Sequence, residues 1–333
     1  MAHNMTTYRK NINGICYILD EENKTASVCS LDDSLLDDTE HYEGHIQIPS
    51  IVTYIERYRV CSIFDYAFAK CKDLTDIILP DSVTSIEEGA FYGCTGLTFI
   101  NIPNNVKCIG LAAFQECYHL TSITIPNSVT SIEAVTFRDC RRLTSVTIPD
   151  GVTNIKNMAF TDCKSLTSII IPDNVTSIGQ GAFLGCTGLT SITIPNGVTS
   201  IGVNAFRECT NLTSITIPNN IQHIGSGAFA DTPWYNAQPN GLIYIGKVLY
   251  AYKGKMPHNT TVVVEDGTIS ISDFAFKDCT GLTSIIIPNS VTSIDDSAFD
   301  GCENLQTIYI PHGMTDTFCK MGLENLRDKI VEI

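Results

Sequence analysis

The chain has 333 residues, of which 44% are hydrophobic and 17% charged, and its net charge at pH 7 is -15. This composition is too apolar for a disordered chain, and no apolar run approaches the roughly 20 residues that a membrane-spanning helix needs. Asp and Glu total 36 against 21 Lys and Arg, which argues against nucleic acid or an anionic membrane as the main partner, because both attract positive surfaces.

The N-terminal segment contains two predicted strands. Residues 13–19 and 25–28 are rich in apolar and β-branched residues, and the acidic turn 20–23 joins them. The first ten residues lack the apolar core of a secretory signal, so a cytoplasmic protein and a protein whose leader was removed are both open. We expect residues 1–45 to form a β-hairpin cap over the array that follows.

Residues 46–231 and 259–311 repeat a pattern of 23 residues, which includes Leu-Thr-Ser-Ile-Thr-Ile-Pro, Val-Thr-Ser-Ile-Gly and Ala-Phe-x-x-Cys. A fixed period of this length predicts a solenoid, in which each coil buries its apolar face against its neighbours. The prolines that mark the period are Pro80, Pro103, Pro126, Pro149, Pro172, Pro195 and Pro218, and the register resumes at Pro288 and Pro311.

Each coil is expected to contain a short strand with alternating burial. In one coil, Leu120, Ile123 and Ile125 have the spacing of a bend followed by a strand, and Pro126 ends that strand because it has no N–H to donate. An extended return leg and a tight helical turn at the Ala-Phe pair complete the coil. Stacked coils would form a parallel sheet with strands about 4.8 Å apart.

The residues between the core positions of these strands are mostly Ser and Thr. They would form a hydroxyl-rich surface that offers hydrogen bonds but no strong acid, base or activated nucleophile. This surface is our first candidate binding site, and it comprises Ser122, Thr124, Ser145, Thr147, Ser168, Ser191, Thr193, Ser214 and Thr216. Phe99 and Tyr309 take such positions and are further candidates.

These repeat segments resemble the BspA-like (Treponema pallidum-type) leucine-rich repeat family of bacterial surface proteins over about residues 49–311. The resemblance implies an α/β solenoid, a right-handed horseshoe with its parallel β-sheet on the concave face. It also implies a cell-surface or secreted protein that adheres to host proteins, such as the extracellular matrix, or to other microbes. No enzymatic activity and no cofactor are implied.

The repeat is interrupted at two places. An insertion around residues 54–61 is expected to widen the loop of the first coil. Residues 232–258 alternate like a β-hairpin and contain Trp234 and Tyr235, two residue types that are enriched in binding hot spots. Packing of these aromatics onto the solenoid is the alternative interpretation. After the last repeat, residues 312–333 have helical composition and are expected to cap the C-terminal end.

Nine of the 14 cysteines occupy the same repeat position, three residues after the Phe, and are expected to form a ladder of buried thiols rather than disulfides or a zinc site. They are Cys71, Cys94, Cys117, Cys140, Cys163, Cys186, Cys209, Cys279 and Cys302. The cysteines outside the ladder are better candidates for a bridge, with Cys16–Cys29 across the first hairpin as one option; the others are Cys61, Cys108 and Cys319.

Two clusters of charged or titratable residues are further candidate sites. Arg138, Arg141 and Arg142 form a basic cluster, which could contact an anion or acidic partner or could be ordinary solvated charge. His41 and His45 are the only closely spaced histidines, but the Gly between them argues against a helical metal pair. No metal is therefore expected there.

The sequence thus predicts a non-enzymatic binding or adhesion module without cofactor, whose partner is a protein or a glycan. We expect it to be a monomer. Two alternatives remain: a structural spacer without its own ligand, and a metal-dependent enzyme centred on His41 and His45. No nucleotide, phosphate or protease motif occurs in the chain.

Overall fold

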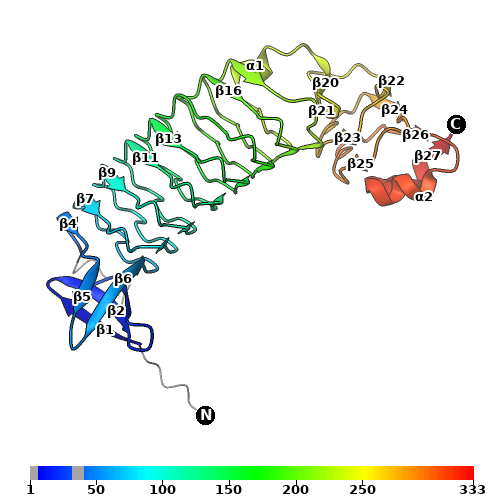
Figure 1. The fold of residues 1–333 in the computed structure, drawn as a ribbon. Helices are drawn as coiled ribbons and strands as arrows, with labels where there is room; N and C mark the ends of the chain where they lie inside the picture. The colour runs from blue at the N-terminus through cyan, green and yellow to red at the C-terminus, as the bar shows by residue number, and fades with distance from the viewer. Residues whose placement is uncertain (1–6, 32–40) are drawn as a thin grey trace.

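The computed structural model describes residues 7–31 and 41–333. These residues form a curved rod of stacked coils, with a small β-sheet at the N-terminal end and short helical turns at the C-terminal end (Figure 1). Most coils contribute one strand to each of two parallel rows, which we call the outer row and the inner row after their positions on the curve. The predicted solenoid with a parallel sheet is confirmed, but it contains little helix. The Ala-Phe pairs, which were expected in helical turns, lie in non-helical turns.

The outer row is built from the Leu-x-x-Ile-x-Ile segments and from the strands that continue them at either end. Neighbouring strands pair in parallel one repeat apart, so that Ile123 lies opposite Val146. The strands are β4 (Gly44–Gln47), β7 (Leu74–Ile78), β9 (Phe99–Asn101), β11 (Ser122–Thr124), β13 (Ser145–Thr147), β16 (Ser191–Thr193), β18 (Ser214–Thr216), β22 (Thr260–Val263), β24 (Leu282–Ile286), β26 (Thr307–Ile310) and β27 (Ile330–Glu332).

The inner row is built from the Val-Thr-Ser-Ile segments, the return legs of the coils. Only two residues of each leg form a strand, and Ile132 lies opposite Ile155 in the same one-repeat register. The strands are β8 (Ser85–Ile86), β10 (Cys108–Ile109), β12 (Ser131–Ile132), β14 (Asn154–Ile155), β15 (Ser177–Ile178), β17 (Ser200–Ile201), β19 (His223–Ile224), β23 (Ser270–Ile271) and β25 (Ser293–Ile294).

The outer row follows the convex side of the rod. Strands β7, β9, β11, β13 and β16 lie along the outer edge of the arc in Figure 1. The hydrogen bonding agrees: from β12 to β19 the inner ladder is continuous, whereas the outer ladder lapses at residues 168–170, where curvature spreads the chains. The expectation that this sheet lies on a concave face is therefore corrected.

The N-terminal sheet contains more strands than the sequence indicated. β2 (Ile15–Asp20) and β3 (Thr25–Cys29) form the expected antiparallel pair, and β1 (Thr7–Ile12) adds a further strand beside β2. The insertion in the first coil is not a widened loop, because β5 (Ile51–Thr53) and β6 (Arg57–Ile63) form an antiparallel hairpin. β3 and the end of β6 pair in parallel and start the inner row.

The second interruption adds one helical turn and one hairpin. Helix α1 (Pro233–Asn236) is followed by β20 (Gly241–Ile245) and β21 (Val248–Lys253), which pair antiparallel. β21 then pairs in parallel with β23, so this hairpin begins a stretch of the inner row just as β2 and β3 do. At the C-terminus, α2 (Thr315–Phe318), the π-helical turn η1 (Cys319–Leu323) and the 3-10 helix η2 (Glu324–Lys329) precede β27.

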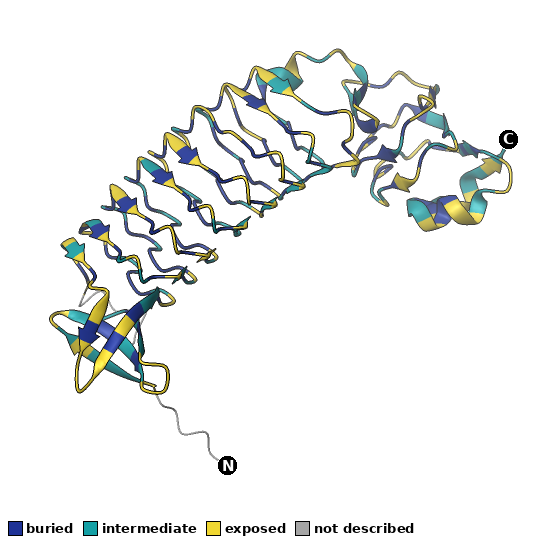
Figure 2. Ribbon diagram, viewed as in Figure 1, coloured by how far each residue is buried: buried dark blue, intermediate teal, exposed yellow. Residues whose placement is uncertain are grey.

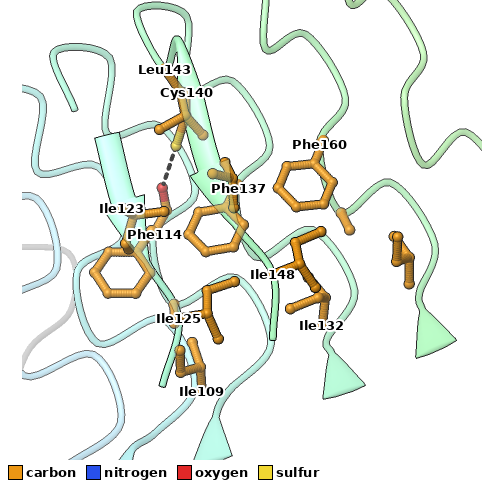
Figure 3. Close-up of a cluster of buried hydrophobic side chains, with 14 of the residues drawn as sticks. Ile109, Phe114, Ile123, Ile125, Ile132, Phe137, Cys140, Leu143, Ile148 and Phe160 are labelled. Atoms are coloured by element: carbon orange, nitrogen blue, oxygen red, sulfur yellow. Dashed lines mark hydrogen bonds between the residues drawn. The ribbon is translucent and has the colours of Figure 1, made fainter. Parts of the chain in front are cut away.

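A column of phenylalanine rings runs through the core. Neighbouring rings from Phe68 to Phe229 stack with centroids 5.1 to 5.7 Å apart and interplanar angles of at most 12°. Figure 3 shows Phe114, Phe137 and Phe160 of this column beside the isoleucines of the two rows. Offset stacking of this kind adds to the burial of each ring, so the column ties each coil between Phe68 and Phe229 to the next.

The cysteines at the repeat position form a second column beside the rings. Cys140 is fully buried, and its Sγ donates to the carbonyl of Phe114 in the preceding coil at 3.2 Å (Figure 3). Burial raises the pKa of the Cys140 thiol well above its ordinary value, which keeps the thiol protonated and unreactive. These cysteines therefore act in packing and not in chemistry.

Candidate binding surface

The predicted hydroxyl surface lies on the outward side of the outer row. In β13, Ser145 and Thr147 are exposed and flank the buried Val146, and the same alternation of burial is visible along these strands in Figure 2. All nine predicted hydroxyl residues occupy such positions, and only Ser122 is half-buried. The one-repeat register of the paired strands places their side chains in two columns that run along the rod.

Large apolar side chains interrupt these two columns. Ile170 is 84% exposed, Val263 60% and Phe99 55%, each at a position that Ser or Thr holds in other coils. Sequence reasoning selected Phe99 and Tyr309 but missed Ile170 and Val263. The sequence does distinguish these two residues. Other repeats carry Ser or Thr at the same positions, so an apolar residue there is visible in the repeat.

Ile170 lies in a shallow groove of about 480 Å³ on this surface. The groove occurs where the outer ladder lapses, and its other walls come from the next two coils, including Thr193 and Thr216. Its lining therefore combines isoleucine side chains with hydroxyl groups and with the polar side chains of Asp173 and Asn196. Such a combination accommodates an apolar side chain with polar groups around it.

A second apolar group lies at the C-terminal end of the outer row. Strand pairing aligns Val263 with Ile286, Ile286 with Tyr309, and Tyr309 with Val331 in a single column. Val263 and Val331 are exposed, and the two residues between them are half-exposed. The last four strands thus present an apolar stripe where the central coils present hydroxyls.

The predicted basic cluster is largely balanced by acidic neighbours. Asp139 lies 3.7 Å from Arg138 Nε and 3.0 Å from Arg141 Nη2. The Arg141 guanidinium also lies over the ring of Tyr118, 4.6 Å from its centroid. Arg142 is exposed. The structure therefore brings these arginines close to a carboxylate, which weakens their attraction for an external anion.

The aromatic residues of the insertion face the core. The Trp234 ring packs edge-on against Phe229 with centroids 5.1 Å apart, and Tyr235 packs edge-on against Tyr250 at 6.0 Å. The Lys253 ammonium donates to the backbone carbonyl of Tyr235 at 3.1 Å and fixes the turn. Trp234 and Tyr235 are both half-buried and close the end of the phenylalanine column.

The histidine pair does not assemble a metal site. His45 Nδ1 is hydrogen-bonded to the Asp76 carboxylate across β4 and β7, and this contact lowers the pKa of Asp76. Within residues 7–31 and 41–333, no group of three or more His, Cys, Asp and Glu side chains could hold a metal ion. The acidic run at residues 32–38 beside these histidines lies outside the described residues.

Comparison with known proteins identifies the repeat. A family model described as "BspA type Leucine rich repeat region (6 copies)" matches residues 61–186, 130–254 and 243–321. The chain belongs to the BspA-type leucine-rich repeat family. No curated protein matches the sequence.

Several solved leucine-rich repeat structures resemble this BspA-type chain. A protein from Bacteroides ovatus is 30% identical with a TM-score of 0.67, and the match covers 92% of this chain and 83% of that protein. A cell surface protein from Faecalibacterium prausnitzii is 29% identical with a TM-score of 0.47 over 95% and 97%. The T. pallidum leucine-rich repeat protein is 25% identical with a TM-score of 0.46 over 68% and 90%.

Membership of the BspA-type family is consistent with a protein-interaction module. In the part of the chain that the structure describes, no helix is long and apolar enough to cross a membrane. The surface chemistry offers hydroxyls, apolar side chains and paired charges, which suit recognition of a partner.

Proposed function

We propose that this chain is a non-enzymatic adhesion module that contacts a protein partner with the outward side of its outer row. The supporting observation is the exposure of Ile170, Val263 and Phe99 among the hydroxyl columns. Apolar side chains in a polar surrounding are the usual composition of a protein-binding surface. Following the family resemblance, we propose that the module works at the cell surface or in secreted form.

The chemistry of the surface favours a protein over a glycan. The exposed apolar residues are chiefly aliphatic, whereas the aromatic Trp234 and Tyr235 pack inward. A net charge of -15 favours a neutral or basic partner. The proposed contact surface leaves out the arginine cluster, because Asp139 already pairs with Arg138 and Arg141.

The repeat supplies its own matched substitutions for a test. Ile170→Thr, Phe99→Ser and Val263→Thr each install a residue that other coils carry at the same position, so the fold should tolerate them. Ile55→Thr is the control, because Ile55 is 78% exposed but follows β5 in the hairpin turn, away from the outer row. Binding of the full chain and the variants to immobilised fibronectin, laminin and collagen is measured by biolayer interferometry, with a glycan array in parallel.

We expect at least one matrix protein to bind, and the triple variant to bind it about tenfold more weakly, a loss of about 1.4 kcal/mol. Equal losses in the triple variant and in Ile55→Thr would remove the outer row from the binding site. Binding to glycans alone would show that the partner is a carbohydrate and not a protein. A chain that binds none of these probes would favour the spacer alternative.

A further inference from the structure

Cys16 and Cys29 lie directly opposite each other on the antiparallel strands β2 and β3. Their side chains therefore point to the same face of the sheet, and both residues are 4% exposed. Opposed residues in an antiparallel pair have Cα atoms about 4.5 to 5.5 Å apart. Disulfides span about 4.4 to 6.8 Å between Cα atoms, so this pair can be bridged with little backbone movement.

The polar contacts of this pair differ from those of the repeat cysteines. The Tyr42 hydroxyl accepts from the Cys16 backbone N–H and donates to the Cys29 carbonyl, each at 2.9 Å, and so holds the two backbones together. Arg9 Nε donates to Cys16 Sγ at 2.9 Å. The guanidinium thus faces any negative charge that develops on this sulfur during an exchange reaction.

One residue of the pair, Cys29, also borders an opening that a small molecule can enter. A pocket of about 440 Å³ opens between the N-terminal sheet and the first coil, and Arg9, Cys29 and Tyr66 line it. The repeat cysteines in the middle of the rod are more deeply enclosed, since Cys94, Cys117 and Cys140 are fully buried. Cys16 and Cys29 thus combine opposed geometry with an opening beside Cys29.

We propose that Cys16 and Cys29 are a disulfide site that closes in the presence of a small disulfide oxidant such as oxidised glutathione. One protein thiolate attacks the S–S bond of the oxidant and releases one glutathione thiol. The second protein thiolate then attacks the mixed disulfide, forms the Cys16–Cys29 bond and releases the second glutathione thiol. Two electrons and two protons pass from the protein thiols to the two glutathione molecules.

The bond would strengthen the end of the rod. Tyr42, which spans the two cysteine backbones, packs its ring against Phe68 with centroids 4.7 Å apart, and Phe68 is the first ring of the stacked column. A bridge between β2 and β3 therefore restrains the residues that cover the first coil. It also restricts the unfolded chain, which stabilises the folded state.

Peptide mapping of the full chain tests this site. Trypsin cleaves after Lys10, Lys24 and Arg57, which places Cys16 alone in peptide 11–24 and Cys29 alone in peptide 25–57. The protein is incubated with oxidised or reduced glutathione, its remaining thiols are alkylated in denaturant, and the digest is analysed by mass spectrometry. Thermal unfolding of both samples is measured in parallel.

We expect the linked pair of peptides 11–24 and 25–57 after oxidation, its loss on treatment with dithiothreitol, and a Tm that is a few degrees higher in the oxidised sample. Cys29→Ser should abolish the linked peptide and the Tm difference, whereas Cys108→Ser, which alters an exposed thiol, should keep both. Separate glutathione adducts on Cys16 and Cys29, or a link from either one to another cysteine, would overturn the proposal.

Discussion

The thiol of Cys140 is hydrogen-bonded to the backbone carbonyl of Phe114, which lies 26 positions earlier in the chain and 3.2 Å away. The same bond recurs one repeat earlier and later, from Cys117 to Phe91 and from Cys163 to Phe137, at the same distance. A side chain therefore satisfies one backbone acceptor of each preceding coil. Ala at this position could not donate this bond.

Replacing one of these thiols should weaken the rod. Cys140→Ala removes the bond to the Phe114 carbonyl and leaves a small void, so we expect the free energy of unfolding to fall by about 1 to 2 kcal/mol. Urea denaturation followed by circular dichroism measures this loss. Cys108→Ala is the matched control at an exposed thiol and should change stability by less than about 0.5 kcal/mol. Equal losses in the two variants would contradict this role.

Truncation of a ring in the phenylalanine column should lower the free energy of unfolding far more than truncation of the exposed Phe99. Phe137 is fully buried between two stacked rings, and Phe137→Ala should cost about 3 to 5 kcal/mol. Phe99→Ser replaces a ring that is 55% exposed and should stay within about 0.5 kcal/mol of the wild type. Chemical denaturation of both variants provides the comparison. A large loss in Phe99→Ser would show that this ring supports the fold.

The same position of the turn segments has a left-handed backbone in several coils, and Val135 is its β-branched occupant. Val135 has φ of 50°, a left-handed conformation that β-branched residues avoid, whereas Asn204 and Gly181 hold the equivalent position in other coils. Val135→Asn should therefore raise the free energy of unfolding by about 0.5 to 1 kcal/mol, measured as an increase in Tm. Gly181→Val, the reverse change, should lower it by about 1 to 2 kcal/mol. Destabilisation by Val135→Asn would show that its side-chain packing outweighs the strain.

The stability of the C-terminal end should depend on pH through Glu332. Its carboxylate accepts from the Thr315 hydroxyl, the Gly313 N–H and the Thr315 N–H, and these bonds lower its pKa from 4.5 to about 2. Because the folded pKa is depressed, this stabilisation is complete above about pH 4.5 and is lost as the pH falls to about 2. Glu332→Gln should thus melt below the wild type at pH 7.

The difference in Tm between Glu332→Gln and the wild type should shrink between pH 4.5 and pH 2. Differential scanning fluorimetry at pH 7, 4 and 2 measures it. A difference that stays constant across this range would mean that the charge of Glu332 does not contribute. Thr315→Val, which removes the hydroxyl donor, should lower Tm at pH 7 in the same direction.

The repeat predicted the buried positions but not the curvature. Ile123 and Phe137 must be buried in any stacked arrangement of this sequence, because each coil offers its apolar face only to its neighbours. The direction of bending depends on how closely the two rows pack, and no single residue encodes that spacing. The hydroxyl columns followed from alternation along the strands. Ile170 was missed, although it breaks the same pattern.

The strands outside the repeat were harder to predict, because their pairing depends on tertiary contacts. β1 was missed although Asn13-Gly14 is a strong hairpin turn signal, and both residues have positive φ. The β5–β6 hairpin has no periodic counterpart in other coils. The contact of Tyr42 with Cys16 and Cys29 joins separate segments, and nothing in the local sequence indicates it.

The hairpin of β20 and β21 divides the rod into two stacks of coils that can unfold separately. The stacked rings stop at Phe229, where Trp234 and Tyr250 meet it edge-on, and a new stack begins only with Phe276 and Phe299. Buried side chains accordingly fall into two clusters that meet at Leu249 and Tyr250. A pulling force or a local fraying event that peels coils from the C-terminal end can halt at this junction, so the longer N-terminal array can survive the loss of the shorter one.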